Sequence, residues 1–231
     1  MQIHEWHMLV ADGAARALKY SFGFGMANTL ALRLEDGTWL VVSPACGVPE
    51  SALDALAKDG DVSALVAPNA YHHLGQAAWR ARWPKAVSYA PEGALARLAK
   101  KSAAIPYKPL AELGARLGAG VRIFVPKGMK NDDVLLSAET SEGTLWFGGD
   151  LISNTQAEDV SFFPRLVFSL LGGGTGYRFN AVPAMVYLAD KAAWKADVRK
   201  ALEAKPLGLM LPAHGEPVRD DGSAKTLALL G

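Results

Sequence analysis

The chain is poor in cysteine and has no excess of either charge. Cys46 stands alone among 231 residues, which excludes an internal disulfide framework and a thiolate-rich zinc cluster. The 24 basic and 23 acidic residues nearly balance, so no electrostatic footprint for nucleic acid or an anionic membrane is present. We therefore expect neither partner, and a small-molecule ligand instead.

Long apolar runs are also missing. No stretch reaches the roughly 20 apolar residues that a membrane span needs. The most apolar region, residues 162–174, is interrupted by Pro164 and Arg165. The first residues lack the basic segment and apolar run of a signal peptide. These features predict a soluble, cytoplasmic protein, whose oligomeric state the sequence leaves open.

Half of the residues are apolar, enough for one large core. In the first half, predicted strands and helices alternate, which indicates helices stacked on a sheet. Asp36-Gly37 between two apolar runs predicts a hairpin. The predicted strands are 30–34, 39–42, 62–67 and 86–89, and the predicted helices are 49–58, 76–83 and 91–101.

The second half repeats this alternation more loosely. Strands are predicted over 121–125, 134–138, 145–147 and 207–211, and a helix over 192–204. The region from Leu151 to Tyr177 has no clear period and is typical of a long, partly helical excursion that serves as a lid or binding element. No linker, low-complexity segment or charge run separates the halves, so we expect one domain over residues 1–231.

Histidine is scarce, and its placement is informative. Of five histidines, three follow predicted strands: His72 and His73 after the strand ending at Ala67, and His214 after the strand ending at Leu211. Asp150 follows the strand 145–147 through two glycines. Loops at the carboxyl ends of strands can converge on one crevice. Imidazole and carboxylate groups together suit zinc or ferrous iron.

Each of these residues also has an ordinary structural interpretation. A histidine after a strand is more often a hydrogen-bonded structural residue than a ligand. Asp150 could cap the turn or helix that follows it. Asn69 could add an oxygen ligand, hold a water molecule or simply form a turn after Pro68. The order of the motifs, more than any one residue, favours a metal site.

That order resembles the metallo-β-lactamase superfamily from about Ala27 to Pro217. The segments that carry the resemblance are 28–32 with 37–42 (first hairpin), 62–73 (first metal motif), 145–150 (strand with the bridging aspartate) and 211–215 (strand with the last histidine). More narrowly, Ala67-Pro68-Asn69-Ala70-Tyr71-His72-His73 resembles an uncharacterised branch of that superfamily. The resemblance implies an α/β fold of the αββα sandwich type.

The chain departs from the family pattern at one half of the usual two-metal site. Aligning the last histidine of His-x-His-x-Asp-His with His73 places Pro68 and Ala70 where two ligands belong, and His72 at the aspartate position. No histidine lies at residues 126–129, where another is usual. The aspartate expected after the first hairpin is Ser43. The resemblance therefore implies a mononuclear site.

The implied ligands are His72, His73, Asp150 and His214. They would hold one divalent ion, with zinc favoured over iron or manganese. His73, Asp150 and His214 should place their ligating atoms within about 5 Å of one another. His72 would be a fourth ligand or the base that orients a water molecule, so His72 and Asp150 are the candidate catalytic residues.

The implied chemistry is metal-dependent hydrolysis of a small ester, lactone, thioester or related substrate. The fold does not choose among these substrates. The alternative is a catalytically silent descendant that uses the crevice for binding or as a scaffold.

Overall fold

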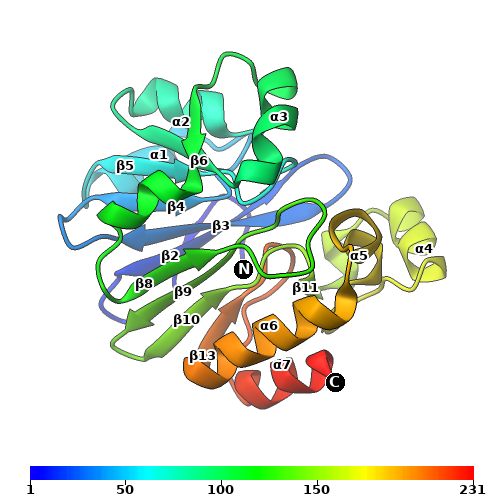
Figure 1. Cartoon of the computed structure of the whole chain (residues 1–231). Coiled ribbons are helices and arrows are strands. Elements are labelled where there is room, and N and C mark those ends of the chain that lie inside the picture. The colour runs from blue at the N-terminus through cyan, green and yellow to red at the C-terminus, as the bar shows by residue number, and fades with distance from the viewer.

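The computed structural model describes residues 1–231, with the side chain of residue 115 outside the description. Two β-sheets lie face to face with helices on their outer surfaces (Figure 1). The first sheet has seven strands in chain order, antiparallel from β1 to β4 and parallel from β4 to β7. Its strands are β1 (Trp6–Met8), β2 (Ala15–Ser21), β3 (Met26–Arg33), β4 (Trp39–Val42), β5 (Val62–Val66), β6 (Val87–Ala90) and β7 (Tyr107–Pro109).

The second sheet has the order β13-β10-β9-β8. Its strands are β8 (Val121–Phe124), β9 (Leu135–Thr140), β10 (Gly143–Phe147) and β13 (Leu207–Leu211). Strands β10 and β13 pair in parallel, although about 60 residues separate them in the sequence. A small third sheet joins β11 (Ile152–Thr155) to β12 (Gly176–Phe179).

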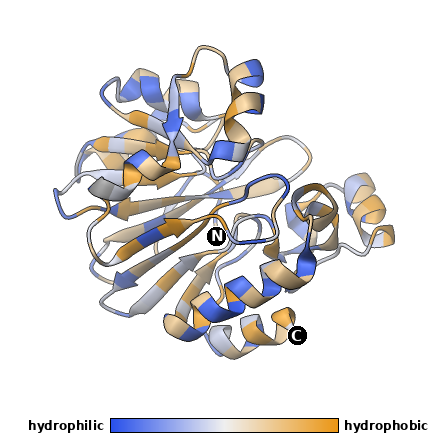
Figure 2. Cartoon of the chain, viewed as in Figure 1, coloured by the Kyte–Doolittle hydropathy of each residue, from blue (hydrophilic) through white to orange (hydrophobic). Residues whose placement is uncertain are grey.

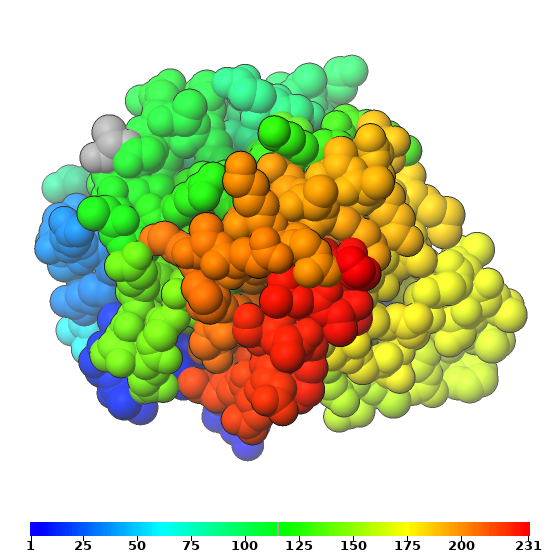
Figure 3. Space-filling model, turned by 60° about the horizontal axis from the view of Figure 1, so that its bottom comes forward, coloured from blue at the N-terminus to red at the C-terminus, as the bar shows by residue number. Residues whose placement is uncertain are grey.

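Helices α1 (Glu50–Ala57), α2 (Gln76–Arg82) and α3 (Glu92–Lys101) cover the first sheet, and α6 (Lys191–Ala204) and α7 (Gly222–Leu230) cover the second. Helices α4 (Phe162–Leu170) and α5 (Ala181–Tyr187) lie beside the sandwich, and two 3-10 turns span Leu110–Arg116 and Ala157–Asp159. Figure 3 shows the α4 segment, in yellow, at the edge of the molecule. Among the described residues, no helix combines the length and apolar character needed to cross a membrane.

Side chains that point alternately to the two faces of each strand explain this layering. In β4, Leu40 and Val42 face the other sheet, whereas Trp39 and Val41 face the helices. In β10, Phe147 enters the inter-sheet core and Trp146 packs against α6. Successive side chains of a strand point to opposite faces, so a strand covered on both faces needs apolar residues throughout. Figure 2 accordingly shows apolar colour along the central strands.

The predicted αββα architecture is confirmed, with most predicted elements within a few residues of their observed bounds. The excursion after Leu151 contains β11, a 3-10 turn, α4 and the start of β12. No residue of α4 is buried, and Phe162 and Phe163 are each 72% exposed. Strands β1, β2 and β7 and helices α5 and α7 were not predicted, because their short apolar patterns do not distinguish them from loops.

Candidate metal centre

Four loops at one end of the sandwich deliver the polar residues of the site. Ser43 directly follows β4, His72 lies in the loop after β5, Asp150 follows β10, and His214 follows β13. Strands β4 and β5 run parallel in one sheet, and β10 and β13 run parallel in the other. Their carboxyl ends therefore bring residues that are far apart in sequence to the same edge.

His72, Asp150 and His214 converge there, with one potential ligand atom from each lying within 4.8 Å of the others. Asp150 Oδ1 lies 3.0 Å from His72 Nε2 and 3.2 Å from His214 Nε2. The two imidazole centroids are 5.3 Å apart. Among the described residues, this is the only group of three or more His, Cys, Asp or Glu side chains whose ligand atoms lie close enough to share one metal ion.

A divalent metal ion fits this arrangement. Asp150 Oδ1 is buried and receives no hydrogen bond of good geometry, even though two ring nitrogens lie close to it. Buried polar atoms nearly always take part in a hydrogen bond, so a carboxylate oxygen that has none and lies between two imidazole nitrogens suggests a cation. Two histidines and one aspartate are also a donor set that zinc and iron accept.

The structure does not bring His73 into this group. Its Nδ1 lies 2.7 Å from Ser102 Oγ, beyond the end of α3. Burial and the nearby charge of Arg97 lower the pKa of His73, which favours the neutral ring. The prediction that His73 converges with Asp150 and His214 is therefore wrong. The histidine that lies beside them is His72.

Local backbone geometry explains why the first histidine of the pair points inward. Asn69 Oδ1 accepts hydrogen bonds from the main-chain N–H groups of Tyr71 (2.9 Å) and His72 (3.1 Å). This side-chain turn orders the loop and fixes the direction of His72. His73, one residue later, points toward α3.

Asp150 forms hydrogen bonds with three further side chains. The sequence indicated only one of them, Asn69, as a candidate site residue. Tyr187 donates to Asp150 Oδ2 at 2.8 Å, and Asn69 Nδ2 donates to the same oxygen at 3.1 Å. Asp133 Oδ2 accepts from the Asp150 main-chain N–H at 2.8 Å, and Asp133 Oδ1 accepts from Asn69 at 2.9 Å. Tyr187 and Asp133 lie in segments without a recognisable motif, so no sequence signal pointed to them.

Gly149 permits the close approach of Asp133. It has φ +58°, and a Cβ there would lie 2.5 Å from Asp133 Oδ2. An alanine at position 149 would therefore be strained and would push the carboxylate away. The glycine before Asp150 is thus a packing requirement of the site.

The outer nitrogens of both imidazoles also have partners. His214 Nδ1 lies 2.7 Å from the Met26 carbonyl oxygen, which can only accept, so Nδ1 carries the proton and Nε2 presents a lone pair when the ring is neutral. His72 Nδ1 lies 2.8 Å from Ser43 Oγ, which in turn contacts Tyr20 Oη at 3.0 Å. Ser43 has φ +56°, an uncommon conformation for a residue other than glycine.

Electrostatics keep Asp150 ionised. Burial opposes the charge of Asp150, but the imidazoles of His72 and His214 outweigh it and hold the pKa of that carboxyl well below its usual range. Burial and the neighbouring Asp150 charge raise the pKa of Asp133 well above its usual range. Burial and Asp150 raise the pKa of Tyr187, so its hydroxyl stays protonated and donates a hydrogen bond to the carboxylate.

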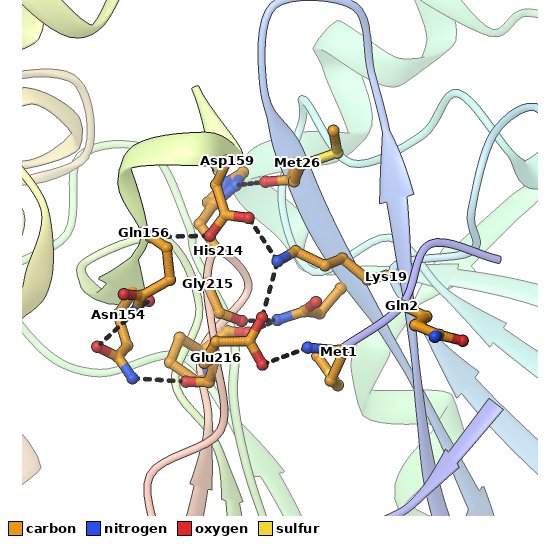
Figure 4. A network of polar contacts seen from close by, with 12 residues as sticks. Met1, Gln2, Lys19, Met26, Asn154, Gln156, Asp159, His214, Gly215 and Glu216 are labelled. Atoms are coloured by element: carbon orange, nitrogen blue, oxygen red, sulfur yellow. Dashed lines mark hydrogen bonds and ion pairs between the residues drawn. The ribbon is translucent and has the colours of Figure 1, made fainter. Parts of the chain in front are cut away.

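A polar network anchors the loop that carries His214 (Figure 4). Buried Lys19 contacts Asp159 and also Glu216, the latter at 2.8 Å. Burial opposes the charge of Glu216, but Lys19 and the Met1 ammonium group outweigh it and lower the pKa of Glu216. Gly215, with φ +99°, packs so tightly that a Cβ would lie 2.0 Å from Asn154 main-chain atoms.

The three converging residues lie in the wall of a pocket of about 390 Å³. Strands β2 and β3 with their connecting turn, the loop after β5, and helices α4 and α5 supply most of the remaining walls. This volume is within the usual range for small-molecule sites. The site therefore combines a group of candidate metal ligands with room for a ligand.

Solved structures share this fold. A metallo-β-lactamase from Erythrobacter litoralis, with β-mercaptoethanol in its active site, is 19% identical, with a TM-score of 0.63 over 97% of this chain and 95% of that one. A metallo-β-lactamase from Hirschia baltica is 15% identical, with a TM-score of 0.61 over 98% and 97%. A metallo-β-lactamase from Pontibacter korlensis is 14% identical, with a TM-score of 0.60 over 98% of both chains.

These likenesses establish the metallo-β-lactamase fold over essentially the whole chain, as the sequence resemblance predicted. No protein-family model matches the chain, and no curated protein sequence is similar to it. At such low identities the fold is shared, while the chemistry must be argued from the site itself.

Proposed function

We propose that this protein is a mononuclear metal-dependent hydrolase, with zinc as the favoured ion and iron or manganese as alternatives. The observation that carries the proposal is the convergence of His72 Nε2, Asp150 Oδ1 and His214 Nε2, with the buried carboxylate oxygen lacking a hydrogen bond. The related folds support it, since the three similar structures named above are described as metallo-β-lactamases.

A bound divalent ion would lower the pKa of a coordinated water toward 7 and polarise a substrate carbonyl. The chain's own residues prepare that chemistry. Met26 fixes the tautomer of His214, and Tyr187 and Asn69 occupy Asp150 Oδ2, so that Asp150 Oδ1 is the oxygen left for the ion. Catalytic metal sites commonly use three protein ligands and leave one position open.

His72 fits the role of ligand better than that of base. Its Nε2 points at Asp150 Oδ1, and its Nδ1 is occupied by Ser43. With His73 removed from the ligand set, the three remaining ligands leave a position for water. The proposal of a single ion rests on Pro68 and Ala70, whose side chains carry no donor atoms for a second one.

The substrate we propose is a small ester, lactone, thioester or related compound. Cytoplasmic location and the absence of nucleic-acid or membrane partners remain predictions from composition. The catalytically silent alternative has one observation in its favour. Asp150 with the two imidazoles forms close ion-pair contacts, which can neutralise a buried charge without a metal.

Metal analysis tests the proposal. The protein is purified without chelator or metal-affinity tag, stripped, and titrated with zinc, iron(II) and manganese(II) while esters and lactones are assayed. We expect saturation near one equivalent and hydrolysis that requires the ion. Two tightly bound equivalents would contradict the mononuclear site, and a folded protein that binds none would support the silent alternative.

A further inference from the structure

Two aromatic rows lead outward from the candidate metal centre. On one side, Phe22 lies 5.6 Å from the His214 ring and 4.9 Å from Phe24, which lies 6.5 Å from Phe168 of α4, all as ring-centroid distances. On the other side, Tyr187, whose hydroxyl reaches Asp150, lies 5.9 Å from Tyr71. All of these rings line the same pocket.

The part of the wall built from residues 160–189 carries no carboxylate, because that whole stretch contains no acidic residue. Its two charged residues are Arg165 and Arg178, and each guanidinium donates to a main-chain carbonyl nearby, of Ala157 and Gly172 respectively. From α5 the pocket receives Val182, Pro183 and Val186. Arg165, Thr155, Thr175 and Asn180 also line the pocket, but most of its wall beyond the His–Asp cluster is apolar.

We propose that this pocket binds an apolar acyl or aryl group, placing the carbonyl carbon attached to it beside His72, Asp150 and His214. The proposal rests on the proposed hydrolase function and names its substrate class: neutral esters or thioesters of an apolar acid. One water molecule is consumed. Its oxygen bonds to the acyl carbon, the acyl C–O or C–S bond breaks, one proton passes to the leaving oxygen or sulfur, and the other is released as the acid ionises.

Burial of one methylene is worth about 0.8 kcal/mol, which corresponds to about a 4-fold change in affinity. Each added methylene should therefore strengthen binding by up to about 4-fold until the chain outgrows the pocket. A longer chain should then gain little, because its added carbons stay in water.

Two series measure this dependence separately. Alkan-2-ones of four to ten carbons are neutral and cannot be hydrolysed, so calorimetry with them reports binding alone. The p-nitrophenyl esters of straight-chain acids with two to twelve carbons, assayed with the zinc-loaded protein, report turnover. We expect ketone affinity and ester kcat/KM to rise with length and to level off at a similar length.

Variants of the pocket wall locate the binding. Val182→Phe adds bulk to a half-buried pocket position and should move the plateau to shorter chains, whereas Phe168→Ala should move it to longer ones. Phe163→Ala is the matched control. It removes the same ring from the same helix, but Phe163 is 72% exposed and is not among the residues that line the pocket.

The outcomes separate the two proposals. Ketone affinity that is independent of length overturns the apolar-group proposal, and esters that are nevertheless cleaved leave the hydrolase proposal standing. Length-dependent ketone binding without ester or thioester cleavage supports the apolar pocket and counts against the hydrolase. A length dependence that disappears in Phe163→Ala but persists unchanged in Val182→Phe would place the binding on the outer face of α4 and overturn the pocket assignment.

Discussion

Adjacent histidines at positions 72 and 73 allow a sharp test of the metal site. His72→Ala removes one of three ligand atoms, whereas His73→Ala removes a ring that contacts Ser102 outside the group. Loss of a hydrogen-bond partner behind a metal ligand costs about 10–100-fold in affinity, so loss of the ligand itself should cost more than about 100-fold. His73→Ala should leave the affinity nearly unchanged.

The loss of zinc affinity in His72→Ala should also appear as a smaller zinc-induced rise in Tm. Zinc at 100 times its Kd stabilises the native state by about 2.7 kcal/mol, and a 100-fold weaker site retains only about 0.4 kcal/mol at the same concentration. The difference of about 2 kcal/mol corresponds to roughly 4–8 °C in Tm for a chain of this size. Most of the zinc-induced rise in Tm should therefore vanish in His72→Ala.

Competition with a chromophoric chelator gives the affinities, and thermal melts with and without zinc give the shifts. Each variant is compared with its own metal-free form, so a general loss of stability does not enter the comparison. If His73→Ala loses the zinc-induced shift while His72→Ala keeps it, the ligand assignment drawn from the structure is refuted. The ligand set would then have to be rebuilt around His73.

Three further outcomes are expected. Tyr187→Phe removes a hydrogen bond to Asp150 and should weaken zinc binding by about 10–100-fold in a chelator competition, with little change in far-UV circular dichroism. Asn69→Asp places a third carboxylate between Asp133 and Asp150. Because the added charge is buried and unpaired, the free energy of unfolding of the metal-free protein, measured in urea, should fall by about 3 kcal/mol or more. An unchanged urea midpoint would contradict this. Glu216→Gln should reduce acid sensitivity: the folded-state pKa of Glu216 lies below its ordinary value of 4.5, so its stabilisation is present above that pH and is lost as the pH falls through the folded-state pKa. Urea midpoints between pH 7 and pH 3.5 should therefore fall more steeply for the wild type than for the variant.

Much of the architecture can be predicted from local patterns in the sequence. Doubly apolar strands such as 39–42 and 62–66 can be predicted because both of their faces are buried, and the turn at Asp36-Gly37 fixes a hairpin by its own backbone preferences. The positions of Asp150 and His214, each next to glycine after an apolar strand, likewise indicated loops at one sheet edge. Helix α4 could be expected only as an irregular excursion, because its apolar residues do not face a core.

Which histidine of the pair enters the site was decided by tertiary structure. His72 and His73 are chemically identical, and their order in the sequence does not determine which way each side chain points. That direction depends on Asn69, which binds the loop backbone through its oxygen and Asp133 and Asp150 through its nitrogen. Those carboxylates lie 64 and 81 residues away in the chain, and only the packing of the two sheets brings them to Asn69. The residue types of the site can therefore be predicted from sequence, whereas the ligand set depends on long-range hydrogen bonds that exist only in the folded chain.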